Sequence, residues 1–131
     1  MRDPADPSEI VVIDDDAIMR DLLADWLVAA GYRVRQASSC RAWMGEPGAR
    51  PPALIVTDMF MPGPCGTDAI AALRARHAGT AIIAVSGHFG AGQRLSAPDA
   101  LAAGADRALA KPLKRAELLG AVAELIGAPG R

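Results

Sequence analysis

The sequence lacks several features that mark particular classes of protein. It has no block of basic residues and a formal net charge of −1, so the charge pattern of a nucleic-acid-binding protein is missing. No apolar run reaches the roughly 18 residues that a membrane-spanning helix needs. No signal peptide, internal repeat or second domain is evident in the 131 residues. We therefore expect one cytoplasmic domain.

Cysteine and lysine are also scarce. Cys40 and Cys65 show no metal-ligand spacing, and we interpret them as reduced thiols rather than as a disulfide or a metal site. Lys111 and Lys114 are the only lysines, whereas arginine is frequent. Hydrophobic residues make up 51% of the chain, which excludes a disordered protein and is enough for a buried core.

Short apolar runs alternate with helical patterns along the chain. The predicted strands are 9–13, 32–37, 53–57, 81–85 and 107–110, and the predicted helices are 17–30, 67–77, 97–103 and 115–126. Residues 38–50 are ambiguous and could include a short helix. Residues 1–8 are predicted to be a flexible arm, 9–127 the domain and 128–131 a tail. This alternation predicts a parallel sheet with helices on both faces and right-handed crossovers.

Two of the predicted helices carry regularly spaced apolar residues. In the first helix, large or apolar residues recur every four positions, at Ile18, Leu22, Trp26 and Ala30. In the last helix, the residues expected to face inward are Leu118, Leu119, Val122 and Ile126. Spacings of three and four residues place side chains on one face of a helix.

Polar residues follow four of the five predicted strands. Asp14 and Asp15 follow the first strand, Asp58 the third, Ser86 the fourth and Lys111 the fifth. In open parallel sheets, ligands bind outside the carboxyl ends of the strands, where the strand order reverses. If the order is 2-1-3-4-5, these four strands are neighbours and their polar residues meet in one crevice.

Carboxylates gathered in one crevice repel one another, and a hard divalent cation such as Mg²⁺ relieves this repulsion. A carboxylate can also act as a nucleophile and form an aspartyl phosphate. A metal ion, an ammonium group and a hydroxyl would then neutralise charge on the transferred phosphoryl group. The pattern therefore favours phosphoryl transfer to Asp58.

Four segments resemble the receiver domain of response regulators in two-component signalling. They are IVVIDDD (10–16), LIVTDMFMPG (54–63), AIIAVSG (81–87) and GADRALAKPL (104–113). The segments occur in the family's order and span most of the chain. The resemblance implies a flavodoxin-like fold, a doubly wound α/β arrangement with five parallel strands in the order 2-1-3-4-5.

The resemblance also implies roles for the residues that bind metal and phosphate. Asp58 would be the phosphoacceptor and a metal ligand, Asp15 would bind Mg²⁺ directly, and Asp14 would act largely through water. The backbone carbonyl of Phe60 would be a further ligand. Ser86 would bind a phosphoryl oxygen.

At the fifth strand, the resemblance implies that Lys111 pairs with the phosphoryl group and that the bond between Lys111 and Pro112 is cis. Ala108 occupies a position where the family usually has an aromatic residue that swings inward on activation. Without that aromatic residue, the output signal must travel another way or be weak. Gly87, in a glycine-rich stretch after the fourth strand, would make that loop pliable.

We expect a signalling switch rather than an enzyme of the usual kind. It would receive phosphate from a sensor histidine kinase or a histidine phosphotransfer protein and act on an unidentified downstream partner. A phosphate shuttle or sink is a second interpretation. A third is a phosphohydrolase with Asp14 as nucleophile and Asp16 as acid, although Asp16 can equally cap the first helix.

In the family, the positions of Phe60 and His88 flank the phosphate and tune its hydrolysis. We predict that the bulky Phe60 side chain screens the attacking water, so Phe60→Asn should shorten the lifetime of the phosphorylated protein. The measurement is the decay of the phosphorylated form followed by intact mass. A decay rate equal to that of the wild type contradicts this prediction.

Overall fold

The computed structural model describes residues 6–38, 52–58, 66–76, 79–86, 101–102 and 104–127. Within these ranges the elements are, in order, β1 (Asp6–Ile13), α1 (Ala17–Ala29), β2 (Arg33–Ala37), β3 (Pro52–Asp58), α3 (Gly66–Arg76), β4 (Ala81–Ser86), β5 (Arg107–Ala110) and α5 (Arg115–Ile126). Among these helices, none has the length and apolar character needed to cross a membrane.

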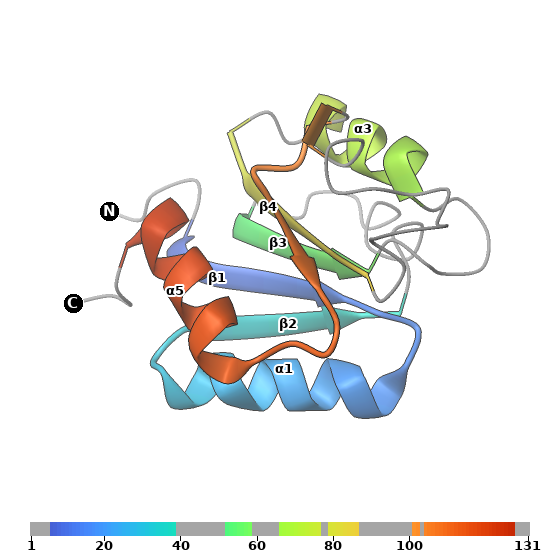
Figure 1. Ribbon diagram of the computed structural model, residues 1–131. Coiled ribbons are helices and arrows are strands. Elements are labelled where there is room, and N and C mark those ends of the chain that lie inside the picture. Colours follow the sequence, from blue (N-terminus) through green and yellow to red (C-terminus); the bar gives the residue numbers. More distant parts are fainter. Residues whose placement is uncertain are drawn as a thin grey trace.

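The five strands form one parallel sheet in the order β2-β1-β3-β4-β5, which confirms the predicted topology. Helices α1 and α5 cover one face of the sheet and α3 covers the other (Figure 1). Since every strand runs in the same direction, the carboxyl ends of all five lie at one edge. The order reverses between β1 and β3, which places the predicted crevice at that edge.

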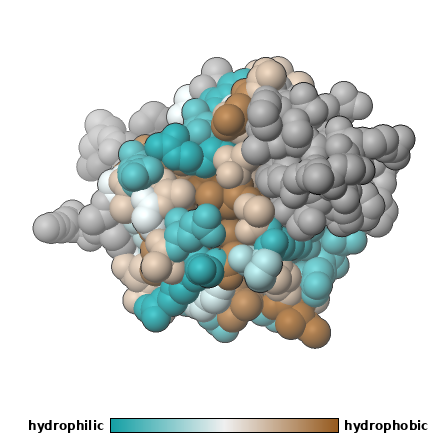
Figure 2. Space-filling model, viewed as in Figure 1, coloured by the Kyte–Doolittle hydropathy of each residue, from teal (hydrophilic) through white to brown (hydrophobic). Residues whose placement is uncertain are grey.

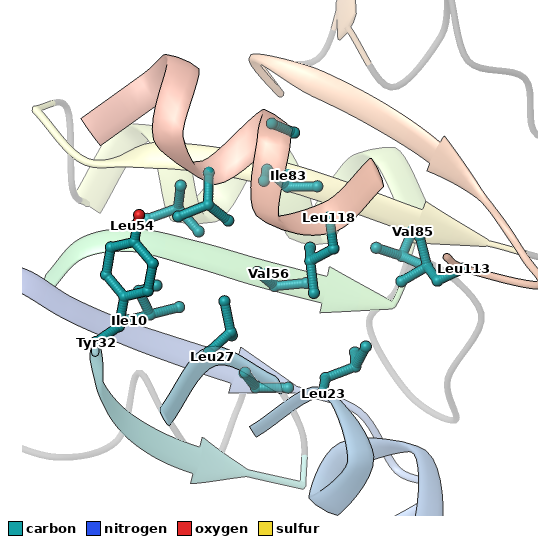
Figure 3. Close-up of a cluster of buried hydrophobic side chains, with 13 residues drawn as sticks. Ile10, Leu23, Leu27, Tyr32, Leu54, Val56, Ile83, Val85, Leu113 and Leu118 are labelled. Atoms are coloured by element: carbon teal, nitrogen blue, oxygen red, sulfur yellow. The ribbon is translucent and has the colours of Figure 1, made fainter. Parts of the chain in front are cut away.

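The central strands are buried on both faces. The residues Ile10 to Ile13 of β1 are at most 1% exposed, and so are Leu54 to Val56 of β3. Continuous apolar strands of this kind are typical of parallel sheets that helices cover on both sides. On the α1 and α5 face, Leu27 and Leu118 pack over β1 and β3 in the main core cluster (Figure 3).

The structure shows which face of α1 is buried. The helix exists, but its buried residues are Leu23, Ala24 and Leu27, whereas Ile18 is 83% and Leu22 is 41% exposed. Of the four apolar residues spaced four apart, Ile18 and Leu22 lie beside the core, whereas Trp26 and Ala30 are partly buried and pack against it. Hydrophobic surface is accordingly visible along α1 at the lower edge of the molecule (Figure 2).

The remaining predicted elements agree more closely. In α5, Leu118 and Val122 are fully buried, and Leu119 and Ile126 pack against the same cluster. Strand β1 begins at Asp6 rather than at residue 9, while the flexibility of residues 1–8 stays a prediction. In the predicted helix at 97–103, residues 101 and 102 are helical and the others lie outside the described residues. Of the ambiguous segment at 38–50, residues 39–50 also lie outside them.

The burial of α1 makes a testable distinction between two of its aliphatic residues. We expect Leu27→Ala, at a fully buried site, to lower the free energy of unfolding by about 2–5 kcal/mol, because it removes apolar contacts and leaves a cavity. Ile18→Ala, at an exposed site, should change it by less than about 0.5 kcal/mol. Urea unfolding of both variants measures the difference, and equal losses contradict the assignment of the buried face.

Candidate functional site

The predicted polar residues meet at the carboxyl edge of the sheet. Asp58 is the last residue of β3, and Asp14 directly follows β1. Ile13 is paired with Thr57 in the ladder, so Asp14 and Asp58 continue two neighbouring strands side by side. Ser86 ends β4 and is paired with Ala110, one residue before Lys111. The sheet therefore brings these four backbone positions to one place.

Asp14 is fixed through its backbone and its side chain. Its side chain is buried, and its Oδ1 accepts a hydrogen bond of 2.9 Å from the backbone N–H of Asp16. Its own N–H donates to the carbonyl of Ala37, and its carbonyl accepts a 2.7 Å hydrogen bond from Nη1 of Arg20. Arg20 also donates through Nε to Gln36 on β2. These contacts hold the carboxylate at the end of β1.

Lys111 brings a positive charge into this cluster of carboxylates. Its Nζ lies 3.1 Å from Oδ2 of Asp58 and 3.7 Å from Oδ2 of Asp14. The bond between Lys111 and Pro112 is cis, as the family resemblance implies. Beyond it, Leu113 is buried in the main core cluster. The ammonium group thus sits between two carboxylates, and the chain that carries it is anchored in the core.

Three carboxylates could share a metal ion at this edge. One oxygen each from Asp14, Asp15 and Asp58 lie within 4.8 Å of one another, and within the described residues no other such cluster is found. Asp14 and Asp58 are buried, while Asp15 is exposed. The single ammonium of Lys111 leaves an excess of negative charge, so the residues present fit a hard divalent cation with oxygen ligands.

Burial and neighbouring charges shift the pKa of two groups in the site. Burial raises the pKa of the Asp14 carboxyl, the hydrogen bond from Asp16 N–H opposes part of this rise, and the Asp58 carboxylate adds to it. Burial alone would lower the pKa of the Lys111 ammonium. The negative charge of Asp58 and the hydrogen bond to it outweigh that effect, and the pKa of Lys111 is raised.

Asp16 belongs to the helix rather than to the crevice. Its Oδ1 accepts hydrogen bonds from the N–H groups of Ile18 at 3.0 Å and Met19 at 3.3 Å. This is the geometry of an N-terminal helix cap, one of the two roles considered for Asp16. An acid that is engaged in capping its own helix is poorly placed to act as a general acid beside Asp14.

Several predicted residues contribute less or fall outside the described part of the chain. Ala108 is partly buried in the middle of β5, opposite Ala84, and Pro112 is exposed. Phe60, Gly87 and His88, and the side chain of Ser86, lie outside what the structure describes.

Sequence reasoning missed Arg20. The sequence offered no signal for it, because Arg20 contacts the carbonyl of Asp14 and the side chain of Gln36, which lie six and sixteen residues away.

Comparisons with known proteins identify the family of this chain. The family model for the response regulator receiver domain matches residues 10–123, and the chain belongs to this family. Among curated relatives, the transcriptional regulatory protein FixJ of Azorhizobium caulinodans is 36% identical over 116 residues, which is 88% of this chain and 54% of FixJ. The acid tolerance regulatory protein ActR of Rhizobium meliloti is 34% identical over 92% of this chain and 59% of ActR. This chain therefore spans little more than half the length of these relatives.

Solved structures show the same fold. A response regulator receiver domain protein from Clostridium thermocellum matches with a TM-score of 0.79 and 28% identity, over 91% of this chain and 94% of its own. A response regulator from Burkholderia pseudomallei matches with a TM-score of 0.77 and 30% identity, over 88% of this chain and 66% of its own. That structure was solved with a phosphorylated aspartic acid, a calcium ion and citrate.

The charge excess in the crevice predicts a change in stability for Asp14→Asn. The amide keeps the oxygen that accepts from Asp16 N–H but removes a buried charge whose ionised form is disfavoured, as the raised pKa shows. In EDTA the thermal midpoint of unfolding should therefore be higher in the variant than in the wild type. Added Mg²⁺ should stabilise the variant less than the wild type.

The matched control is Asp25→Asn, which removes the same charge from an exposed position on α1. It should leave both the midpoint in EDTA and the response to Mg²⁺ unchanged. An Asp14→Asn variant that is less stable than the wild type in EDTA, with a full response to Mg²⁺, contradicts the charge balance described here.

Proposed function

We propose that this chain is a phosphorylation-controlled switch in which the carboxylate of Asp58 accepts a phosphoryl group. The donor would be a phosphohistidine on a sensor histidine kinase or a histidine phosphotransfer protein. The observation that carries this proposal is the 3.1 Å contact between Asp58 Oδ2 and Lys111 Nζ, inside a cluster of three carboxylates. The family membership of the chain gives the contact its functional context.

The position of Asp58 favours it over the other two carboxylates as the nucleophile. Asp14 is held by Asp16 N–H and by its own backbone contacts, and Asp15 is exposed at the start of the turn before α1. Asp58 lies on β3, between the acidic residues that follow β1 and the lysine that follows β5. A phosphoryl group on Asp58 would thus lie close both to the acidic residues that would hold a cation and to the ammonium of Lys111.

A divalent cation, which we propose to be Mg²⁺, would be held by Asp14, Asp15, Asp58 and the backbone carbonyl of Phe60. When bound, it would neutralise charge on the phosphoryl oxygens. Lys111 would move its hydrogen bond from the carboxylate to a phosphoryl oxygen, and the Ser86 hydroxyl would donate to another. Both groups would then stabilise charge that develops during transfer.

In the transfer itself, the bond between phosphorus and the histidine nitrogen of the donor breaks as a bond from phosphorus to a carboxylate oxygen of Asp58 forms. Hydrolysis later breaks that new bond when water attacks the phosphorus, which releases inorganic phosphate and restores the carboxylate. The chain would therefore catalyse its own phosphorylation and dephosphorylation without turning over a free substrate as an enzyme does.

The output of the phosphorylated form is a separate part of the proposal. FixJ and ActR are regulatory proteins by name, and the chain spans little more than half of each. We propose that phosphorylation changes the binding of a downstream protein, which is unidentified.

A phosphate shuttle or sink would use the same site, and rapid reversible transfer to a second phosphohistidine would distinguish it from a switch. Nothing in the site favours the phosphohydrolase. A cytoplasmic location stays a prediction from the sequence.

The test is intact mass after incubation with Mg²⁺ and acetyl phosphate. The wild type should gain one phosphate, and omission of Mg²⁺ should abolish the gain. Asp58→Asn should gain none, since an amide is not a nucleophile for this transfer. Asp25→Asn, which removes an exposed carboxylate from α1, should behave as the wild type does. A phosphate adduct that persists in Asp58→Asn contradicts the assignment of the acceptor.

A further inference from the structure

Strand β5 carries Lys111 but has little of its own to fix its position. It is an edge strand of four residues and pairs only with β4. Its sequence is Arg-Ala-Leu-Ala, with both ends exposed and only Ala108 and Leu109 partly buried. Leu109 packs against the core cluster, and this single apolar contact within a short edge strand specifies its register weakly. A slip of one residue would move Lys111 by about 3.3 Å and turn each side chain to the opposite face.

Asp106 supplies the missing anchor immediately before β5. Its backbone N–H donates to the carbonyl of Ile82 at 2.7 Å, and its Oδ2 accepts from the N–H of Ile82 at 2.9 Å. Asp106 therefore engages both backbone groups of one residue on β4. The next pair along is Ile83 with Arg107, the first pair of the β4–β5 ladder. A two-point contact at this place sets the register of the strand.

Arg74, from α3, holds Asp106 in turn. Its Nη2 lies 2.7 Å from Asp106 Oδ2 and also donates to the carbonyl of Gly104, while its Nη1 donates to the carbonyl of Thr80 at 2.8 Å. One planar guanidinium thus joins α3 to the residue before β4 and to the turn before β5. Lysine could not reproduce this arrangement, because its single ammonium lacks the fixed fork of donors.

Gly104 permits the close approach of this arginine. Its φ is +131°, and a Cβ added there would lie 3.1 Å from the Cβ of Arg74. Glycine adopts that backbone conformation without the strain that other residues would incur. The turn is therefore shaped around the arginine side chain, and Asp106 follows it by two residues.

We propose that Arg74 and Asp106 are positioning residues for the phosphorylation site. They fix the register of β5 from the end opposite to Lys111 and thereby place the Lys111 ammonium against Asp58. On the far side of Lys111, Leu113 is anchored in the core, so the lysine is held from both directions. This inference rests on the proposed function of Asp58 and Lys111.

The experiment measures the initial rate of phosphorylation by acetyl phosphate and the Mg²⁺ affinity of several variants. Asp106→Ala should slow phosphorylation by between about tenfold and about 100-fold, the cost of misplacing a group at a reacting centre. The Mg²⁺ dissociation constant should change by less than about twofold. Asp106→Asn keeps an oxygen acceptor for Ile82 and should recover most of the loss.

Two comparisons separate positioning from a general loss of structure. In a Lys111→Ala background, Asp106→Ala should slow the reaction by less than about a further twofold, because the group that it positions is already absent. Glu124→Ala breaks the exposed ion pair with Arg107 at the start of the same strand and should have no effect. Equal slowing in both backgrounds, or no slowing in either, overturns the inference.

Arg74→Lys is the second variant should Asp106→Ala fail to fold, and it should show the same dependence on Lys111. A wild type that takes up no phosphate from acetyl phosphate would count against the proposed function, and the crystal structure of Asp106→Ala would then decide the inference by itself. In that variant structure, a distance of more than about 4 Å between Lys111 Nζ and Asp58 Oδ2 is beyond ion-pair contact and supports positioning by Asp106. An unchanged contact overturns it.

Discussion

The concentration of negative charge at one edge of the sheet is the constraint on which the rest of the structure depends. Three carboxylates lie within 4.8 Å, and two of them are buried. Such an arrangement is unfavourable unless cations compensate it and the surrounding structure is rigid. The buried apolar runs of β1 and β3 provide the rigidity, and Lys111 provides part of the compensation. The remaining charge excess gives the site its affinity for a divalent cation and, in our proposal, for chemistry on phosphate.

The neighbours of the crevice serve this arrangement in different ways. Arg20 and Gln36 tie the end of β1 to α1 and β2, which holds Asp14 in place. The Asp16 carboxylate caps the N-terminus of α1, so that helix begins immediately after the acidic residues that follow β1. On the opposite side, the lysine depends on a short edge strand whose register is fixed at its far end by Asp106. Contacts distant from the crevice thus determine its geometry.

Much of the fold and the site could be predicted from the sequence, because buried parallel strands leave an unambiguous pattern. Continuous apolar runs located the strands, and the polar residues that follow them located Asp14, Asp58 and Lys111. The spacing of apolar residues in α1 predicted the helix but not its buried face. Ile18 and Leu22 continue an apolar stripe beside the core, and spacing alone does not indicate which of two adjacent stripes meets the sheet.

The supporting contacts could not be predicted, for a different reason. Arg74 and Asp106 are separated by 32 positions and show no periodicity or motif that links them. Their contact becomes visible only when α3 and the turn before β5 are placed in space. Arg20 is similar, since an arginine on the first turns of a helix is usually a solvated residue.

The most direct test of the account is a crystal structure with Mg²⁺ and beryllofluoride, which mimics a phosphoryl group on a carboxylate. The account predicts beryllium bonded to a carboxylate oxygen of Asp58, with Lys111 Nζ in contact with a fluorine and the metal ion bound by Asp14 and Asp15. Beryllofluoride on Asp14 or Asp15, or a Lys111 side chain directed away from the bound group, would contradict it.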